Sequence, residues 1–209
     1  ICKEGKDFNE FMKALNTITV WLCRRIAADG EGATKLLECK VSGAKDKDTA
    51  KTVAKSVVCS SLTKAAMFGS DANWGRVLCA IGYSGADVDV NKIDVWFKSD
   101  KGSILVCENG AGVDFSEEKA KEILSENEID ILIDLKSGDA SSTAWGCDLT
   151  YDYVKINGDY RTYCEKRRER YEHFKRGARK GSCPRAAVYT GLRRQDSRRQ
   201  IRRQRDDER

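Results

Sequence analysis

The stretch Asp29–Lys35 constrains the fold of this chain more than any other part of its sequence. It reads Asp-Gly-Glu-Gly-Ala-Thr-Lys and separates a helical pattern from the pattern of a strand. Glycines on both sides of Glu31 allow the backbone to turn tightly and to hold the carboxylate against a ligand. Taken alone, however, a glutamate in such a turn is more often a solvated surface residue. The turn therefore leaves both interpretations open.

A helix is expected before this turn, from a cap at Asp7 to about Ala28. Its apolar residues recur at steps of three and four and fall on one face: Phe8, Phe11, Met12, Leu15, Ile18, Leu22 and Ile26. We expect this apolar face to pack on a sheet.

Short helical and extended patterns alternate after the turn. Strands are expected near residues 34–41, 93–97, 104–107, 129–135 and 142–149, and helices near 46–59, 60–67, 77–81 and 116–124. Apolar and charged residues alternate over 128–136, which is typical of a half-buried strand. The order predicts an α+β fold with layered helices and a mixed or antiparallel sheet.

The loop Phe68–Arg76 has two interpretations. Asp71 or Asn73 at a helix start leaves free backbone N–H groups nearby, and Arg76 adds a cation, so an anion could bind there. Alternatively, the loop is an Asx-capped turn in which Trp74 fills part of the core. The residues alone favour the capped turn.

Nine cysteines occur in the chain, with no Cys-x-x-Cys pair. This odd number and wide spacing argue against a disulfide framework or a zinc site, and favour reduced thiols in a cytoplasmic protein. They are expected to be small core residues. No metal and no cofactor are expected, and no apolar run approaches the ~20 residues that cross a bilayer.

Charge divides the chain near residue 162. The net charge is +5 overall, but residues 163–209 alone hold 17 Lys and Arg against 7 Asp and Glu. We expect three parts: a core portion at 1–85 that contains the turn, a small α+β module at 86–162, and an Arg-rich extension at 163–209. The composition of the extension predicts disorder, and its alternative is a nucleic-acid-binding arm.

Three sequence runs, taken in the order in which they occur, together resemble those of a known protein family. They are the 29–35 turn, the Asn73–Arg76 core of the loop, and Trp145–Thr150 followed by Ile156-Asn157 and Tyr160-Arg161-Thr162. Over residues 7–162 the chain resembles the carboxy-terminal part of the ornithine acetyltransferases, the bifunctional glutamate N-acetyltransferases of arginine biosynthesis. The resemblance implies the carboxy-terminal part of that fold.

The resemblance also implies a mechanism that needs no cofactor. In this family the precursor cuts itself, and the new amino-terminal threonine of the β chain takes the acetyl group from N-acetylornithine and passes it to glutamate. The implied partners are an α chain and the amino-terminal part of the β chain, in a hetero-oligomer. Use of acetyl-CoA is left open.

Three substrate-binding positions are carried over from the family. Glu31 matches a carboxylate that suits the ammonium group of ornithine. Asn157 and Thr162 match two contacts near the carboxy-terminal end, where their amide and hydroxyl groups could pair with the amino-acid part of the substrate. For these two, a helix cap and a chain end remain competing interpretations.

The nucleophile is not expected in this chain. The family's threonine should lie several tens of residues before the turn, whereas thirty residues precede Glu31 and the first of them is Ile1. Thr17 and Thr19 fall inside the expected helix and have no free α-amine. We therefore expect the chain to be inactive without the segment that carries the nucleophile. The alternative is a catalytically inactive remnant, which would stay inactive even with that segment.

Overall fold

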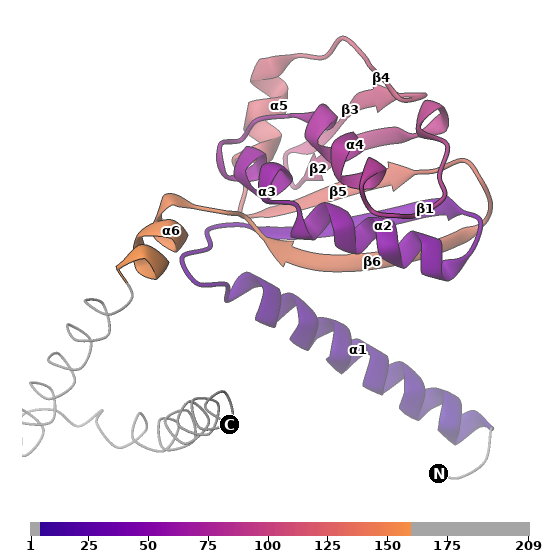
Figure 1. Cartoon of the computed structure of the whole chain (residues 1–209). Helices are drawn as coiled ribbons and strands as arrows, with labels where there is room; N and C mark the ends of the chain where they lie inside the picture. The colour runs from indigo at the N-terminus through magenta and orange to yellow at the C-terminus, as the bar shows by residue number, and fades with distance from the viewer. Residues whose placement is uncertain (1–4, 160–209) are drawn as a thin grey trace, which may run out of the picture. The chain divides into compact units, whose positions relative to one another are not determined.

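The structure is a computed structural model that describes residues 5–159, and it has the α+β fold expected from the sequence (Figure 1). The helical elements are α1 (Lys6–Ala28), α2 (Lys47–Cys59), α3 (Ser61–Phe68), α4 (Trp74–Gly82), the short 3-10 helix η1 (Val90–Lys92), α5 (Glu117–Leu124) and α6 (Tyr151–Gly158). The strands are β1 (Leu36–Ala44), β2 (Asp94–Ser99), β3 (Gly102–Glu108), β4 (Ala111–Gly112), β5 (Glu128–Asp134) and β6 (Ala140–Cys147). The Arg-rich extension and Thr162 lie outside the described residues.

The six strands form one mixed sheet in the order β4-β3-β2-β5-β1-β6. Strand β1 pairs with β5 in parallel and with β6 in antiparallel orientation. It comes from the expected 1–85 portion, whereas its neighbours come from the 86–162 portion, so the two portions share one core. The chain divides into two compact units at residues 155 and 156.

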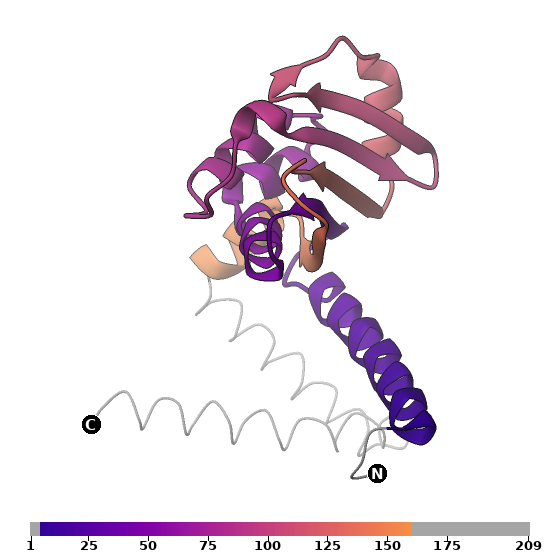
Figure 2. The same cartoon turned by 90° about the vertical axis from the view of Figure 1, so that its right-hand side faces the viewer.

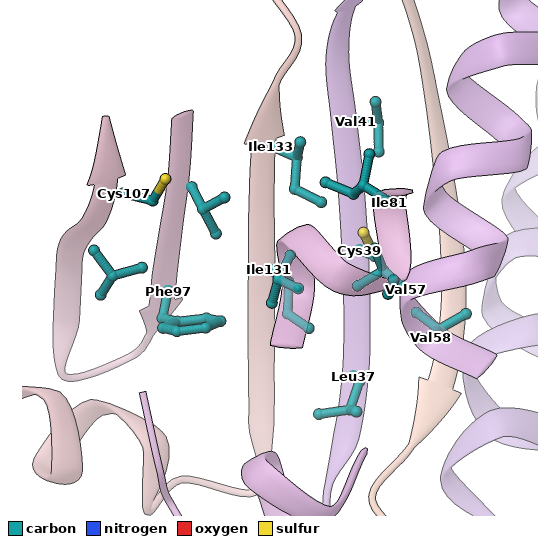
Figure 3. Close-up of a cluster of buried hydrophobic side chains, with 14 of the residues drawn as sticks. Leu37, Cys39, Val41, Val57, Val58, Ile81, Phe97, Cys107, Ile131 and Ile133 are labelled. Carbon is teal, nitrogen blue, oxygen red and sulfur yellow. The ribbon is translucent and has the colours of Figure 1, made fainter. Parts of the chain in front are cut away.

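One face of the sheet is covered by helices and holds the core. Leu37, Cys39 and Val41 point to this face from β1, and Ile131 and Ile133 lie beside them on β5 (Figure 3). Helices α2, α4 and α5 supply further members of the same buried cluster: Val53, Val57, Val58, Val77, Ile81, Ile123 and Leu124. The period-2 pattern of the strands is therefore matched by apolar helix faces, as expected for a layered α+β fold.

Capping side chains specify the starts of several helices, but not of α1, which begins after Gly5 without a side-chain cap, so the expected cap at Asp7 is wrong. Asp46 accepts a hydrogen bond from the backbone N–H of Thr49 at 2.7 Å, and Ser60 and Ser116 cap α3 and α5 in the same way. The backbone N–H of Thr49 lowers the pKa of the Asp46 carboxyl. These caps explain why short helices begin where the sequence pattern predicts.

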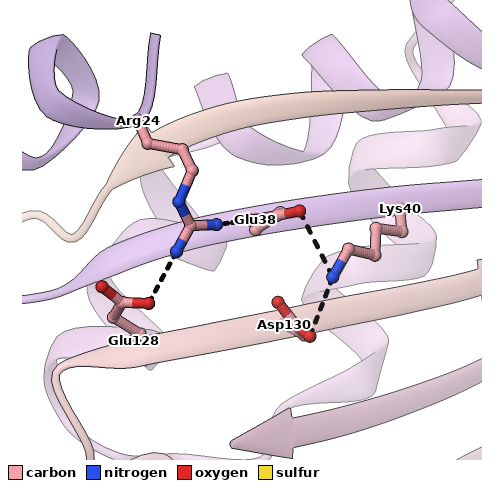
Figure 4. Close-up of polar contacts among 5 residues, drawn as sticks. All are labelled: Arg24, Glu38, Lys40, Glu128 and Asp130. Carbon is pink, nitrogen blue, oxygen red and sulfur yellow. Dashed lines mark hydrogen bonds and ion pairs between the residues drawn. The ribbon is translucent and has the colours of Figure 1, made fainter. Parts of the chain in front are cut away.

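The opposite face of the sheet carries charged side chains. Arg24 of α1 bonds to Glu38 on β1 and, at 2.6 Å, to Glu128 on β5 (Figure 4). The Lys40 ammonium pairs with the Glu38 carboxylate at 3.2 Å and with the Asp130 carboxylate at 3.0 Å. Because these groups are only partly buried, the pairs position α1 on the sheet more than they stabilise the fold.

Helix α1 does not use its apolar face for this contact. Apart from Phe8 near its start, its partly buried residues are Val20, Cys23, Arg24 and Ala27, which lie on the side opposite most of the apolar residues. The expectation that the apolar face packs on the sheet is therefore wrong for the described residues, and no residue of α1 is buried. Figures 1 and 2 show the helix running out from the sheet in both views.

The cysteines are mixed in their environments. Cys39 and Cys107 are buried in the core, where loss of solvation raises the pKa of each thiol. Cys59 and Cys79 are exposed, so the expectation that the cysteines are core residues is wrong for these two. Within residues 5–159, no helix is long and apolar enough to cross a membrane.

Candidate functional site

The Asp29–Lys35 turn connects the end of α1 to the start of β1. Asp29 ends the helix by donating its N–H to the carbonyl of Arg25 at 3.1 Å. Ala33 then donates to the carbonyl of Gly30 at 3.0 Å, which closes a tight turn around Glu31. Glu31 is exposed at the tip of this turn. Its carboxylate is thus presented by a short, hydrogen-bonded stretch of backbone.

The two glycines of the turn are required for different reasons. Gly32 has φ +70°, a left-handed conformation that favours glycine. A Cβ on Gly30 would lie 2.6 Å from the Sγ atom of Cys147, and one on Gly32 would lie 2.9 Å from the nitrogen of Tyr153. The turn is therefore packed closely against the segment from Cys147 to Tyr153, more than a hundred residues later in the chain.

Asp148 holds this packing in place. Its Oδ1 accepts the N–H groups of Thr34 at 2.8 Å and Lys35 at 3.0 Å, and its Oδ2 accepts the hydroxyl of Thr34 at 2.5 Å. Asp148 is only 3% exposed. A buried carboxylate with several donors is a strong constraint because its hydrogen bonds are charge-assisted. We call this arrangement the Asp148 clamp.

Lys35 extends the clamp into the helical layer. Its ammonium group donates to the carbonyl of Met67 at 2.7 Å, the carbonyl of Leu124 at 2.7 Å and the hydroxyl of Ser70 at 2.8 Å. Burial lowers the pKa of Lys35, and the nearby Asp148 carboxylate partly opposes that shift. The ammonium caps the ends of α3 and α5, where helix carbonyls lack partners.

Thr150 makes a second link between the turn and the later segment. It is 5% exposed, and its hydroxyl donates to the carbonyl of Gly32 at 2.6 Å. The same oxygen accepts the backbone N–H of Tyr153 in the first turn of α6 at 3.2 Å.

The three expected substrate residues differ in how the structure places them. Glu31 is at the tip of the clamped turn, and Asn157 is exposed on α6, in the second compact unit. Thr162 lies outside the described residues, so the substrate roles of all three stay predictions. The structure does bring the 29–35 and 145–150 runs together, although they lie far apart in the sequence.

The Asn73–Arg76 run forms the capped turn that the sequence favoured over an anion site. Asn73 caps α4 by accepting the N–H of Arg76 at 3.2 Å. The Arg76 guanidinium donates to the carbonyl of Leu62 at 3.1 Å. Trp74 packs against the core and occupies the space beside Gly112. This cation therefore already bonds to the protein, which does not favour the anion-site alternative.

Sequence reasoning missed the parts that hold the site together. Asp148, Thr150 and Lys35 were seen only as members of motifs, without structural roles. A signal was present for Thr150 alone, because threonine is a residue type that caps helix starts and Thr150 directly precedes α6.

Comparison with known proteins identifies the family. The model of the ArgJ family matches residues 2–162. The arginine biosynthesis bifunctional protein ArgJ of Caldanaerobacter subterraneus subsp. tengcongensis is 56% identical over 156 residues, which cover 75% of this chain and 39% of that protein. The glutamate N-acetyltransferase of Methanopyrus kandleri is 48% identical, over 77% of this chain and 42% of its own length.

A crystal structure supports the same assignment. ArgJ from Bacillus halodurans superposes with a TM-score of 0.72 at 45% identity, covering 77% of this chain and 74% of the crystallised one. The chain spans about 40% of the length of the curated relatives that it matches. Since the family model covers three quarters of its residues, the chain belongs to the ArgJ family.

Proposed function

We propose that this chain forms part of a cytoplasmic glutamate N-acetyltransferase that transfers the acetyl group of N-acetylornithine to glutamate in arginine biosynthesis. The observation that carries the proposal is the family match over residues 2–162, which includes the turn that presents Glu31. The cytoplasmic location is supported by the cysteines of residues 5–159, all of which are free.

We assign substrate binding to Glu31, Asn157 and Thr162. An exposed carboxylate on a rigid turn suits the ammonium of ornithine, because a fixed group loses little conformational entropy on binding. The amide of Asn157 and the hydroxyl of Thr162 would pair with the substrate's own polar groups.

The attacking threonine belongs to a segment that the longer relatives contain. Thr17 and Thr19 are poor candidates, because each hydroxyl donates to a carbonyl one turn earlier in α1, at 2.9 and 2.7 Å. A mid-helix threonine also has no α-amine to activate it. The partners in this proposal are therefore the α chain and the amino-terminal part of the β chain.

The exposed face of α1 is the surface we propose for docking that segment. It consists of large apolar side chains that are 43–74% exposed: Phe11, Met12, Leu15, Ile18, Trp21, Leu22 and Ile26. A contiguous apolar patch of this kind marks an interaction site. About 60% of the length of the matched relatives lies outside the match, and that part supplies an occupant. A second copy of this chain is the competing occupant.

The first test of the function is reassembly. The chain alone is expected to show no acetyl transfer from N-acetylornithine to glutamate. Co-expression with the preceding part of the 56% identical relative, including its nucleophilic threonine, is expected to restore turnover. The measurement is N-acetylglutamate formation by mass spectrometry. Turnover by the chain alone would disprove the assignment of the nucleophile, and an inactive, correctly assembled complex would disprove the proposed function.

The second test concerns the docking face. The double variant Ile18→Glu/Leu22→Glu is expected to abolish co-purification with the added segment, because it puts two charges into an apolar interface. The matched control is Lys13→Glu/Thr17→Glu, two acidic substitutions at exposed positions off the apolar face of the same helix. Sedimentation of the chain alone detects a second copy. Concentration-dependent dimers that only Ile18→Glu/Leu22→Glu disrupts would favour self-association instead.

A further inference from the structure

We infer that Thr150 is a positioning residue of the proposed substrate site. Its hydroxyl joins the turn that presents Glu31 to the first turn of α6, within the first compact unit. The substrate role in this inference rests on the proposed function, whereas the link itself rests on the hydrogen bonds of Thr150.

The link runs through a single oxygen atom. Thr150 Oγ1 donates to the Gly32 carbonyl at 2.6 Å and accepts the Tyr153 N–H at 3.2 Å. A hydroxyl has one donor and two acceptor positions, so it can make both bonds at once. Because Thr150 is almost fully buried, water is poorly placed to replace it on either side.

The backbone on both sides of this link is closely packed. Gly32 lies so close to α6 that a Cβ would come 2.9 Å from the Tyr153 nitrogen and 3.2 Å from Asp152. The Asp148 clamp fixes the turn two residues further on, at Thr34. The Gly32 carbonyl belongs to the Gly32–Ala33 peptide, whose N–H also closes the turn around Glu31, so Thr150 fixes the backbone beside the residue that presents the carboxylate.

The start of α6 is fixed from a second side as well. Tyr151 packs edge-to-face on Phe68 of α3 with 5.4 Å between ring centroids, and Leu149 donates its N–H to the Lys64 carbonyl at 3.2 Å. The helix start therefore has its own support in the layer of helices. The hydrogen bond from the Thr150 hydroxyl to the Gly32 carbonyl then fixes the Gly-Glu-Gly turn relative to this helix start.

Threonine offers a clean pair of substitutions for testing this. Thr150→Val keeps the shape and removes the hydroxyl, whereas Thr150→Ser keeps the hydroxyl. The matched control is Thr63→Val, since Thr63 is also buried and its hydroxyl donates to the carbonyl of Arg76, outside the turn. Thr63→Val and Thr150→Val therefore remove equivalent groups from different places.

Hydrogen exchange in the chain itself tests the link. Thr150→Val is expected to speed amide exchange at Tyr153 and at Ala33, whose N–H closes the turn, by about tenfold or more, whereas core amides such as Ile131 stay within about twofold. Thr150→Ser is expected to exchange as the parent does, and Thr63→Val to leave Ala33 and Tyr153 protected. Unchanged protection of both amides in Thr150→Val would overturn the inference.

Kinetics of the reassembled enzyme tests the positioning role. Thr150→Val is expected to raise KM for N-acetylornithine about tenfold, equivalent to about 1.4 kcal/mol, with kcat within about threefold. Thr150→Ser should restore KM, and Thr63→Val should leave KM unchanged. If Thr150→Val and Thr63→Val lowered kcat/KM equally, Thr150 would contribute to the stability of the fold and not to the position of the substrate site. An inactive parent complex would contradict both the proposed function and the substrate role of Thr150. The hydrogen-exchange result would then test only the structural link between the turn and α6.

Discussion

Glu31→Ala in the reassembled enzyme is expected to lower kcat/KM for N-acetylornithine by about a hundredfold or more. Glu31 is exposed in this chain, but in the proposed complex the substrate would bury it. Removing one partner of a buried, hydrogen-bonded charge pair costs about 2–5 kcal/mol, and about 3 kcal/mol corresponds to that factor. The loss should be large because the turn is held by the Asp148 clamp and cannot move another group into place. Initial rates over a range of N-acetylornithine concentrations measure it.

Two variants separate the charge of Glu31 from its other properties. Glu31→Gln keeps the size and a hydrogen-bonding group, so most of the loss should remain if the carboxylate charge binds the ammonium. Glu122→Ala removes a glutamate that is also exposed, on α5, and should leave kcat/KM unchanged. An unaffected Glu31→Ala enzyme would remove Glu31 from the site, whatever the family resemblance implies.

Local patterns predicted most of the elements. The three- and four-residue steps before the turn, the alternation at Ile129, Ile131 and Ile133, and the serine before α5 are each short-range signals that the structure follows. The order of strands had no such signal. Pairing β1 with β5 in parallel joins residues about ninety positions apart, and the sequence predicted only that the sheet would be mixed or antiparallel.

The apolar face of α1 shows a different limit of sequence patterns. Periodicity indicates that one side of a helix is apolar, but it does not say what covers that side. In this chain the sheet is contacted by the side that bears Arg24, through Glu38 and Glu128, and the apolar residues remain exposed. The expected packing was wrong because the charged residues on the sheet, rather than apolar ones, face the helix.

Only the local part of the candidate site could be predicted from the sequence. The position of Glu31 between two glycines is a local feature, and the structure places it at the tip of a turn. The groups that hold the turn are separated from it by 114 and 118 residues, in the pairs Thr34–Asp148 and Gly32–Thr150. No single-sequence pattern joins residues across that distance, so the clamp appears only in the folded chain.

Asp148→Ala is expected to destabilise the chain by about 3 kcal/mol and to lower Tm by about 6–12 °C. The substitution removes the acceptor of two backbone N–H groups and one hydroxyl, and it takes a carboxylate away from the neighbourhood of the Lys35 ammonium. The partly buried Lys35 then keeps its desolvation cost with less compensation. Calorimetry or thermal circular dichroism of the chain measures the change.

Asp46→Ala provides the matched control for this prediction. Asp46 also accepts a backbone N–H and a hydroxyl, both from Thr49 at 2.7 and 3.0 Å, but it is exposed at the start of α2. Because water can replace an exposed acceptor, its loss should lower Tm much less than the loss of Asp148. Asp148→Asn should fall between the two, since one amide oxygen can still accept the N–H groups of Thr34 and Lys35. Equal effects of Asp148→Ala and Asp46→Ala would mean that burial adds nothing to the contribution of the clamp.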